Sequence, residues 1–410
     1  MYHITYVHIQ RGIILTKIEK KFLSWVQRYY IPLFIIIITI LAIWIRYNAR
    51  NYESTDYKNY LVHWFNEIKY LGGVHALSHQ VGDYNITYQF LISLMTYLHI
   101  DPLYSYKVIS SIFDFALAIS SGVLATMVIN TDKKARLFSS VYAIVLMLPT
   151  VIVNSAYWAQ CDSIYSTFVI LSLIFLKKDK FIATFACLGL AFAFKLQAIF
   201  ILPFYIYYYF AQKKYSIFNF LIGVITFYIA CLPGILMGRS WLAPFNIYAN
   251  QQSEYPRMAF HFPNIWSIIN RPYDYLSSLA IILTISILGY GLFYILSHHI
   301  DLDINYNYIM MLTWSVWSCV MFLPAMHERY GYLVDVLLII CTFIDKRFFS
   351  ISCLDIFISL AADSIYLFGV KLHIFSLIAL LYLGLYVSAT YIIFNKLKLQ
   401  FHNDSEIKII

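Results

Sequence analysis

Residues 31–45, with the sequence IPLFIIIITILAIWI, decide the fold class of this chain. The run is apolar on every side of the helix that it would form, and a membrane span needs about 20 predominantly apolar residues. Similar runs recur at residues 216–235 and 276–296. Transmembrane strands alternate apolar and polar residues, whereas these runs do not, so helices must satisfy the backbone here. The sequence therefore predicts an all-α, polytopic transmembrane helical bundle.

The composition excludes an ordinary water-soluble fold. Of the 410 residues, 61% are hydrophobic and only 12% are charged, whereas a soluble domain is about 25% charged. The six cysteines are scattered without a CxxC pair, which favours neither a disulfide framework nor a zinc site. No linker, soluble domain or internal repeat is evident, so we treat residues 1–410 as a single transmembrane unit. The first thirty residues do not follow the order of a removable signal peptide.

The basic residues indicate the topology of the chain. There are 29 Lys and Arg against 21 Asp and Glu, a balance of +8, and many of the basic residues gather in short connections between apolar runs. Such connections are cytoplasmic by the positive-inside rule, so the charge is better explained by membrane topology than by a nucleic-acid partner. The connections are residues 11–28, 133–136, 177–180, 213–214, 346–347 and 396–398.

This rule and the apolar runs together predict about twelve spans, with both ends inside. Residues 86–99 are short for a span, so we expect them to form a re-entrant or interfacial helix. With that choice every basic connection stays inside. The polar segments around residues 51–83, Trp158, Lys195, residues 238–275 and His327 then share the outer side. The predicted spans are residues 31–48, 103–129, 137–155, 160–176, 181–194, 196–210, 216–235, 276–296, 306–324, 330–344, 348–368 and 373–395.

The first outer loop carries the acids Glu53, Asp56 and Glu67 close to the membrane plane. Asp56 is a candidate general base. Apolar residues recur after it at intervals of three and four, which predicts an amphipathic interfacial helix. Aspartate is also favoured at helix N-caps, so Asp56 has either role or both.

Two cations interrupt apolar surroundings. Arg46 lies at the outer end of the first span, where the positive-inside rule disfavours a basic residue. A bound anion would explain an arginine at this position. Lys195 breaks a long apolar run, and a charge at membrane depth is a functional candidate by default. For both residues the alternative is that the side chain snorkels to the interface.

Two short polar motifs complete the candidate site. The turn WAQCD places Gln160 and Asp162 beside Trp158, as a carbohydrate-binding or hydroxyl-binding group requires, although an ordinary interfacial loop has the same composition. The run MHERY holds His327, Glu328 and Arg329, which together can bind a phosphate and orient a second group. The alternative is a solvated charge run between spans.

Other chemistries find less support in the sequence. His75 and His79 have the spacing of metal ligands on a helix face, but no third ligand is evident, so a solvated loop is the better interpretation. Glycine-rich phosphate loops, GxSxG and HExxH are all missing from the sequence. Nucleotide-powered chemistry on the inner side is therefore not expected.

The order of these features resembles the integral-membrane GT-C glycosyltransferases. An inner amino terminus, a first span ending in Arg46, an early acid at Asp56, the WAQCD turn, Lys195 and the late HERY motif follow one another in this order. The resemblance spans about residues 46–330. It is closest to the bacterial relatives of the mannosyltransferase that adds the second mannose to GPI anchors.

This resemblance implies transfer of a sugar from a polyprenyl-phosphate carrier to an acceptor on the outer face, with inversion. It implies that Asp56 is the base, and that Trp158 and Asp162 border the sugar or the acceptor. The family turn commonly has Gly where Ala159 stands. A second acid often accompanies the base, and Glu53 is a candidate for it, which leaves a divalent metal requirement open. The residues implied to face the carrier phosphate are Arg46, Lys195, His327 and Arg329.

We therefore expect a polyprenyl-phosphate-sugar-dependent, mannosyltransferase-like enzyme in the cell membrane. It would transfer a hexose to a cell-surface polysaccharide or a lipid-linked glycan on the extracytoplasmic face, with no certain cofactor. A carboxylate can take the proton of a sugar hydroxyl, and cations can stabilise the departing phosphate. The rival interpretations are a transporter or flippase, whose cations line a pathway, and a polymerase of lipid-linked glycans.

Overall fold

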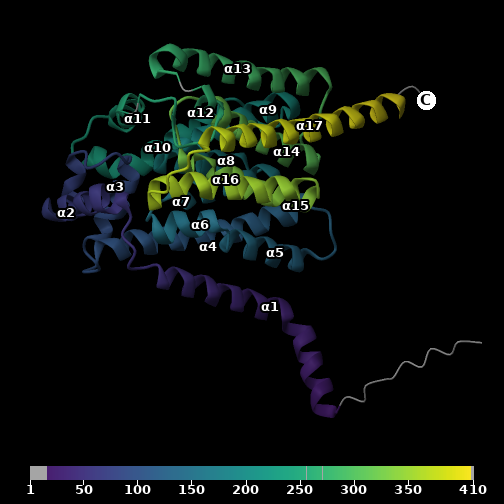
Figure 1. The fold of residues 1–410 in the computed structure, drawn as a ribbon, viewed down its shortest axis with the longest axis horizontal. Helices are drawn as coiled ribbons and strands as arrows, with labels where there is room; N and C mark the ends of the chain where they lie inside the picture. Colours follow the sequence, from purple (N-terminus) through teal and green to yellow (C-terminus); the bar gives the residue numbers. More distant parts are fainter. Residues whose placement is uncertain (1–15, 255, 270, 408–410) are drawn as a thin grey trace, which may run out of the picture.

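The structure is a computed structural model that describes residues 16–254, 256–269 and 271–407. The described residues form an all-α structure, with 79% of them helical and almost no strand. Most of the long helices lie side by side along one direction and form a bundle (Figure 1). The prediction of an all-α helical bundle is confirmed.

Among the residues that the structure describes, six helices are long and apolar enough to cross a membrane by their length and composition. A seventh span results if α5 (Lys134–Leu146) and the following helical segment Pro149–Tyr157, which are bent by 50° relative to each other, count as one. That segment consists of α6 (Pro149–Ile152) and the π-helical turn η3 (Val153–Tyr157). The six helices are α1 (Lys17–Asn48), α4 (Pro102–Val128), α10 (Asn219–Leu236), α13 (Tyr273–Ser297), α16 (Phe348–Phe368) and α17 (Phe375–Ile407).

The remaining predicted spans are helices at the expected positions, but they do not meet the same criterion of length and apolarity. α14 is buried from Tyr306 to Phe322 and is therefore surrounded by protein along nearly all of its length. α15 has 13 residues, about 20 Å at 1.5 Å per residue, against a hydrocarbon core of about 30 Å. The count of about twelve spans thus stays a prediction. These helices are α7 (Asp162–Lys177), α8 (Phe181–Phe194), α9 (Leu202–Gln212), α14 (Asn305–Phe322) and α15 (Tyr332–Ile344).

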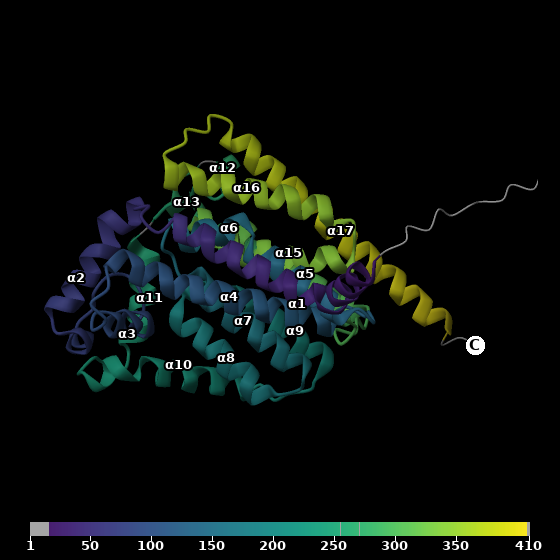
Figure 2. The same ribbon diagram turned by 90° about the horizontal axis from the view of Figure 1, so that it is seen from below.

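The two ends of the bundle differ. α2 (Val62–Tyr70), α3 (Ile86–Met95) and α11 (Ala243–Glu254) lie together at one end, which we call the cavity end (Figures 1 and 2). The first residues of α1 and the last residues of α17 lie at the opposite end, the terminal end. α3 has only 10 residues, about 15 Å, which is too short to cross a bilayer.

The amphipathic helix predicted after Asp56 is present. A π-helical turn, η1 (Tyr57–Leu61), continues into α2. Its apolar side chains Tyr57, Leu61, Phe65 and Ile68 are buried, and they pack in a cluster with residues of α3 and α4. The apolar face of this helix is therefore covered by protein, and its predicted position at the membrane interface stays a prediction.

The long segment 238–275 has structure of its own. Besides α11, it contains the strand β1 (Ala259–Phe260) and α12 (Ile265–Ile269). β1 pairs in parallel with β2 (Met326–His327), which precedes the 3-10 turn η5 (Glu328–Gly331). This pairing fixes the segment beside the HERY motif. Two further 3-10 segments, η2 (Gly73–Ser78) and η4 (Leu196–Ile201), lie before α3 and α9.

Candidate functional site

A cavity of about 650 Å³ lies where the loops of the cavity end meet. Its volume is within the usual range for small-molecule sites, about 300–1,000 Å³. Six of the ten site residues proposed from the sequence line it. The six are Asp56, Gln160, Lys195, His327, Glu328 and Arg329.

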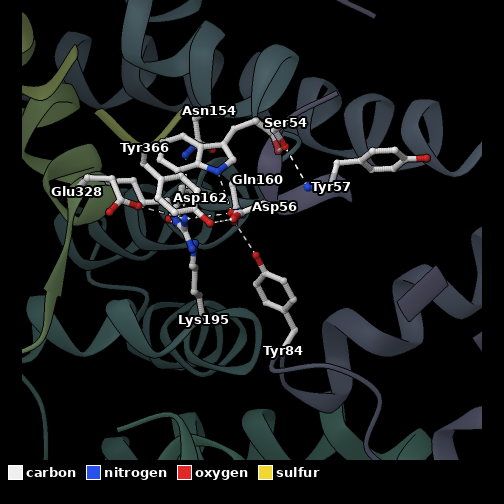
Figure 3. Close-up of polar contacts among 12 residues, drawn as sticks. Ser54, Asp56, Tyr57, Tyr84, Asn154, Gln160, Asp162, Lys195, Glu328 and Tyr366 are labelled. Carbon is white, nitrogen blue, oxygen red and sulfur yellow. Dashed lines mark hydrogen bonds and ion pairs between the residues drawn. The ribbon is translucent and has the colours of Figure 1, made fainter. Parts of the chain in front are cut away.

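Asp56 presents its carboxylate to this cavity rather than capping a helix. Its side chain makes no cap hydrogen bond, and the N–H of Tyr57 instead donates to Oγ of Ser54 at 3.1 Å. Oδ2 of Asp56 accepts hydrogen bonds from Nε1 of Trp158 at 2.8 Å and Nε2 of Gln160 at 2.7 Å. Figure 3 shows these contacts around the carboxylate. The prediction that Asp56 could be an N-cap is wrong, because Ser54 fills that role.

Lys195 is buried and paired. Its Nζ lies 2.5 Å from Oδ1 of Asp162, and the two side chains are 7% and 0% exposed. The other oxygen of Asp162 accepts a 2.8 Å hydrogen bond from Nδ2 of Asn154. Asp162 is therefore the support behind Lys195, and the snorkelling alternative for Lys195 is wrong.

Arg329 lies between three carboxylates. Its guanidinium nitrogens are 3.6 Å from Asp56, 3.6 Å from Asp162 and 3.5 Å from Glu328, and its cation lies 5.3 Å from the centre of the Trp158 ring. Burial alone would lower the pKa of Arg329, but the carboxylates, Asp162 first, raise it well above its ordinary value. Nε makes no hydrogen bond among the described residues. The guanidinium thus stays charged and keeps donor capacity for an anion.

The two residues before Arg329 have unusual protonation. Burial raises the pKa of Glu328 to about 7, with Arg329 opposing the shift. Burial, together with the charges of Arg329 and Lys195, lowers the pKa of His327 to about 3. The His327 ring stacks on Phe260 of β1, with the centroids 4.4 Å apart. His327 is therefore neutral at pH 7 and can offer a hydrogen bond to a phosphate, but not a positive charge.

Arg46 lies outside this cavity lining. Its Nε and Nη2 donate to Oδ2 of Asp114 in α4, at 3.0 and 2.8 Å, and Nη2 also donates to the carbonyl of Leu146. Only 6% of its side chain is exposed. The anion that explains Arg46 is therefore a residue of this chain, and both snorkelling and a position facing the carrier phosphate disagree with the structure.

Glu53 is also outside the site. Its side chain is 48% exposed and lies 3.5 Å from Nζ of Lys58, and it does not line the cavity. The interpretation of Glu53 as a second acid beside Asp56 finds no geometric support, because Glu53 is exposed beside Lys58 whereas Asp56 lines the cavity. Trp158 and Asp162 complete the sequence-predicted set as supports behind Asp56 and Lys195.

Several residues of the site were not identified from the sequence. Tyr366 of α16 donates a 2.5 Å hydrogen bond to Oδ1 of Asp56 and stacks on Trp158. Tyr84 donates to Oε1 of Gln160 at 2.6 Å, and Arg257 and His261 line the cavity from segment 238–275. Because the chain contains 37 tyrosines, the sequence alone does not distinguish Tyr84 or Tyr366 as a site residue. Asp114, the partner of Arg46 outside the cavity, did carry a signal, since it is an acid within an apolar run.

The turn before Asp162 shows why a glycine would suit it. Ala159 has φ +62°, in the left-handed region that glycine adopts at little cost. A residue with a Cβ therefore occupies a backbone conformation that favours glycine.

The histidines with metal-ligand spacing lie away from this set. His75 is in η2 and His79 follows it, where Nδ1 of His79 is 2.8 Å from Oγ of Ser78. Across residues 16–254, 256–269 and 271–407, no group of three or more His, Cys, Asp and Glu side chains is arranged to hold a metal ion. The acids of the cavity are instead arranged around Lys195 and Arg329.

The site can therefore take a proton at Asp56 and bind an anion at Arg329. A carboxylate held by three donors and a charged guanidinium 3.6 Å away face the same cavity. Compared with models of known protein families, the chain matches none. Its sequence has no significant similarity to any curated protein.

Proposed function

We propose that this protein is an inverting glycosyltransferase that uses a polyprenyl-phosphate-linked hexose as donor. The observation that carries the proposal is the position of Asp56, a carboxylate held by hydrogen bonds at a cavity that also contains Arg329 and Lys195. The order of the sequence motifs, which resembles the GT-C glycosyltransferases, adds support. The acceptor is a hydroxyl of a cell-surface polysaccharide or a lipid-linked glycan.

The reaction needs one base and a stabilised leaving group. Asp56 takes the proton of the acceptor hydroxyl while the hydroxyl oxygen attacks the anomeric carbon. The bond between that carbon and the phosphate oxygen breaks, and the polyprenyl phosphate leaves with the bonding electrons. The positive charge of Arg329, in a site of low dielectric constant, stabilises the negative charge that develops on the phosphate. Neutral His327 adds a hydrogen bond.

The positive charge of Lys195 is partly neutralised by the carboxylate of Asp162, so Lys195 contributes less to phosphate binding than Arg329 does. Its ammonium is 2.5 Å from Asp162, so it is held in place rather than free to follow a ligand. Arg329 is different, because its contacts to carboxylates are 3.5 to 3.6 Å, longer than hydrogen bonds. We therefore assign the main phosphate contact to Arg329.

The same proposal includes the topology. About twelve spans with both ends inside would put the cavity end on the extracytoplasmic face of the cell membrane. The terminal end would then face the cytoplasm. The connections before α5 and between α9 and α10 are rich in basic residues, and such connections are cytoplasmic by the positive-inside rule. The lipid donor then reaches the cavity from the outer leaflet.

The test is an assay of the purified protein with a polyprenyl-phosphate-linked hexose and a glycan acceptor. Asp56→Asn should abolish detectable transfer while the donor still binds. Glu53→Gln is the matched control, since Glu53 is in the same loop but outside the cavity, and it should retain transfer. Unchanged transfer by Asp56→Asn would remove Asp56 as base. Movement of the donor across a proteoliposome membrane without a new glycosidic bond would instead favour a flippase.

A further inference from the structure

The first half of α1, residues 17–30, extends beyond the bundle. α1 has 32 residues, about 48 Å at 1.5 Å per residue, whereas a hydrocarbon core is about 30 Å thick. The helix contains Pro32, and a proline inside a helix bends it because it removes a hydrogen bond and clashes with the preceding turn. Figure 1 shows that the first part of α1 turns away and runs across the common direction of the bundle helices.

This segment is a well-defined helix from its first residue. Oγ1 of Thr16 accepts a hydrogen bond from the N–H of Glu19, and Oε2 of Glu19 accepts one from the N–H of Thr16. This reciprocal pair is a capping box, which stabilises a helix start. At the other end of the segment, Nη2 of Arg136 donates to the hydroxyl of Tyr30 at 3.0 Å, which ties the bend to α5.

One side of the segment is a stripe of large apolar residues. Ile18, Phe22, Trp25 and Tyr29 follow one another at intervals of four, three and four, so they share one face of the helix. Their exposed fractions are 83%, 60%, 48% and 38%. The bundle does not cover this stripe.

Another side of the segment is basic. At about 100° per residue, Lys17, Lys21 and Arg28 fall in one sector, and Lys20 lies next to it. All four side chains are exposed. The segment has these four basic residues and one acid, Glu19, which gives a net charge of +3, and the carboxylate of that acid is occupied by Thr16.

We propose that residues 17–30 form an interfacial helix that binds an anionic lipid surface at the terminal end of the bundle. The apolar stripe lies at the acyl boundary, and the four basic side chains reach the headgroup phosphates. Trp25 and Tyr29 fit the preference of amphipathic aromatic rings for membrane interfaces. The inference does not depend on the proposed glycosyl transfer.

Two observations favour lipid over a protein partner. The exposed apolar surface continues without a break into the membrane-spanning half of α1, where Ile36, Ile40 and Trp44 are 52%, 61% and 61% exposed. The basic face matches the negative charge of phospholipid headgroups, to which each Lys or Arg near the surface adds about 1 kcal/mol. A second copy of this chain would bring the same positive charge and be repelled.

The full-length protein can test this in nanodiscs. Spin labels are attached at Phe22→Cys, on the apolar stripe, or at Lys21→Cys, its neighbour on the basic face. The background carries Cys353→Ser, because Cys353 is the exposed cysteine among the described residues. Collision with oxygen reports lipid contact, and collision with a water-soluble nickel chelate reports water contact. The nanodiscs contain either phosphatidylcholine alone or a mixture with phosphatidylglycerol.

With anionic lipid, the label at position 22 should be shielded from the chelate and reached by oxygen, while the label at position 21 stays open to the chelate. Replacing Lys17, Lys20 and Arg28 by Gln should raise chelate access at position 22 at least about threefold. The matched control replaces Lys178, Lys213 and Lys346, which are exposed in other connections, and should change nothing. Equal chelate access at both positions in every lipid would overturn the proposal. So would spin–spin broadening, which would show a second copy on the stripe.

Discussion

The hydroxyl of Tyr366 donates a 2.5 Å hydrogen bond to the carboxylate of Asp56, although the two residues are 310 positions apart in the chain. Together with Trp158 and Gln160 it gives the carboxylate three donors from two other parts of the chain. Such donors fix the orientation of a base and limit the rotamers that it can adopt. The site therefore depends on how α16 packs beside the first loop.

Tyr366→Phe removes one of these donors and keeps the ring that stacks on Trp158. Hydrogen bonds to charged groups contribute about 1.5–3 kcal/mol, so we expect the turnover rate to fall by about tenfold or more. The donor KM should change little, since Asp56 does not hold the phosphate. Steady-state kinetics would measure both values. Tyr391→Phe, at a 71% exposed position of α17, is the control, and an equal loss in both variants would contradict the assignment.

The pair of Arg46 and Asp114 should be structural. Arg46→Met or Asp114→Leu alone leaves one buried charge without its partner, at a cost of about 3–5 kcal/mol. The double variant should recover most of that stability, which thermal unfolding in detergent would show. Its donor KM should match that of the unmodified protein. A donor KM that rises several-fold in the well-folded double variant would mean that Arg46 binds the phosphate after all.

Glu328 should make stability depend on pH. Burial raises its pKa from 4.5 to about 7 in the folded protein, so the folded state binds this proton more tightly than the unfolded chain does. The contribution of this proton to the free energy of unfolding is fully present below about pH 4.5. It is lost as the pH rises through about 7, and the total loss is about 3 kcal/mol at most. Glu328→Gln should remove this part of the pH dependence.

Thermal unfolding at about pH 5 and about pH 8 checks this prediction. The unmodified protein should lose more stability between these two conditions than Glu328→Gln does. Glu67→Gln, at an exposed position of α2, should keep the pH dependence of the unmodified protein. Identical behaviour of all three proteins would show that Glu328 titrates normally.

The turn at Ala159 offers a stabilising change. Its φ of +62° is unfavourable for a residue with a Cβ, by roughly 1–2 kcal/mol. Ala159→Gly should relieve this and raise the free energy of unfolding by about 1 kcal/mol, with transfer retained. Ala156→Gly, in the preceding π-helical turn η3, where φ is not in the left-handed region, should instead lower stability by about 1 kcal/mol. Destabilisation by both changes would show that the turn is not strained.

The sequence by itself determined the helices with good accuracy. The predicted span 103–129 corresponds to α4 (Pro102–Val128), and the predicted span 181–194 to α8 (Phe181–Phe194). Helix positions could be predicted because the apolar run that forms a helix is contiguous in the chain and is ended by local signals. Likewise Asp56, Lys195 and the HERY motif could be selected, since polar residues stand out in apolar surroundings.

Only the tertiary structure decided the partner of each charge. Arg46 and Lys195 give the same signal in the sequence, a cation in an apolar stretch, yet Lys195 lines the cavity and Arg46 is held by Asp114. Glu53 and Asp56 are three residues apart, yet Glu53 is exposed at the surface and Asp56 lines the cavity. A charge at membrane depth must find an opposite charge or a donor, and the packing of distant helices determines which one is within reach.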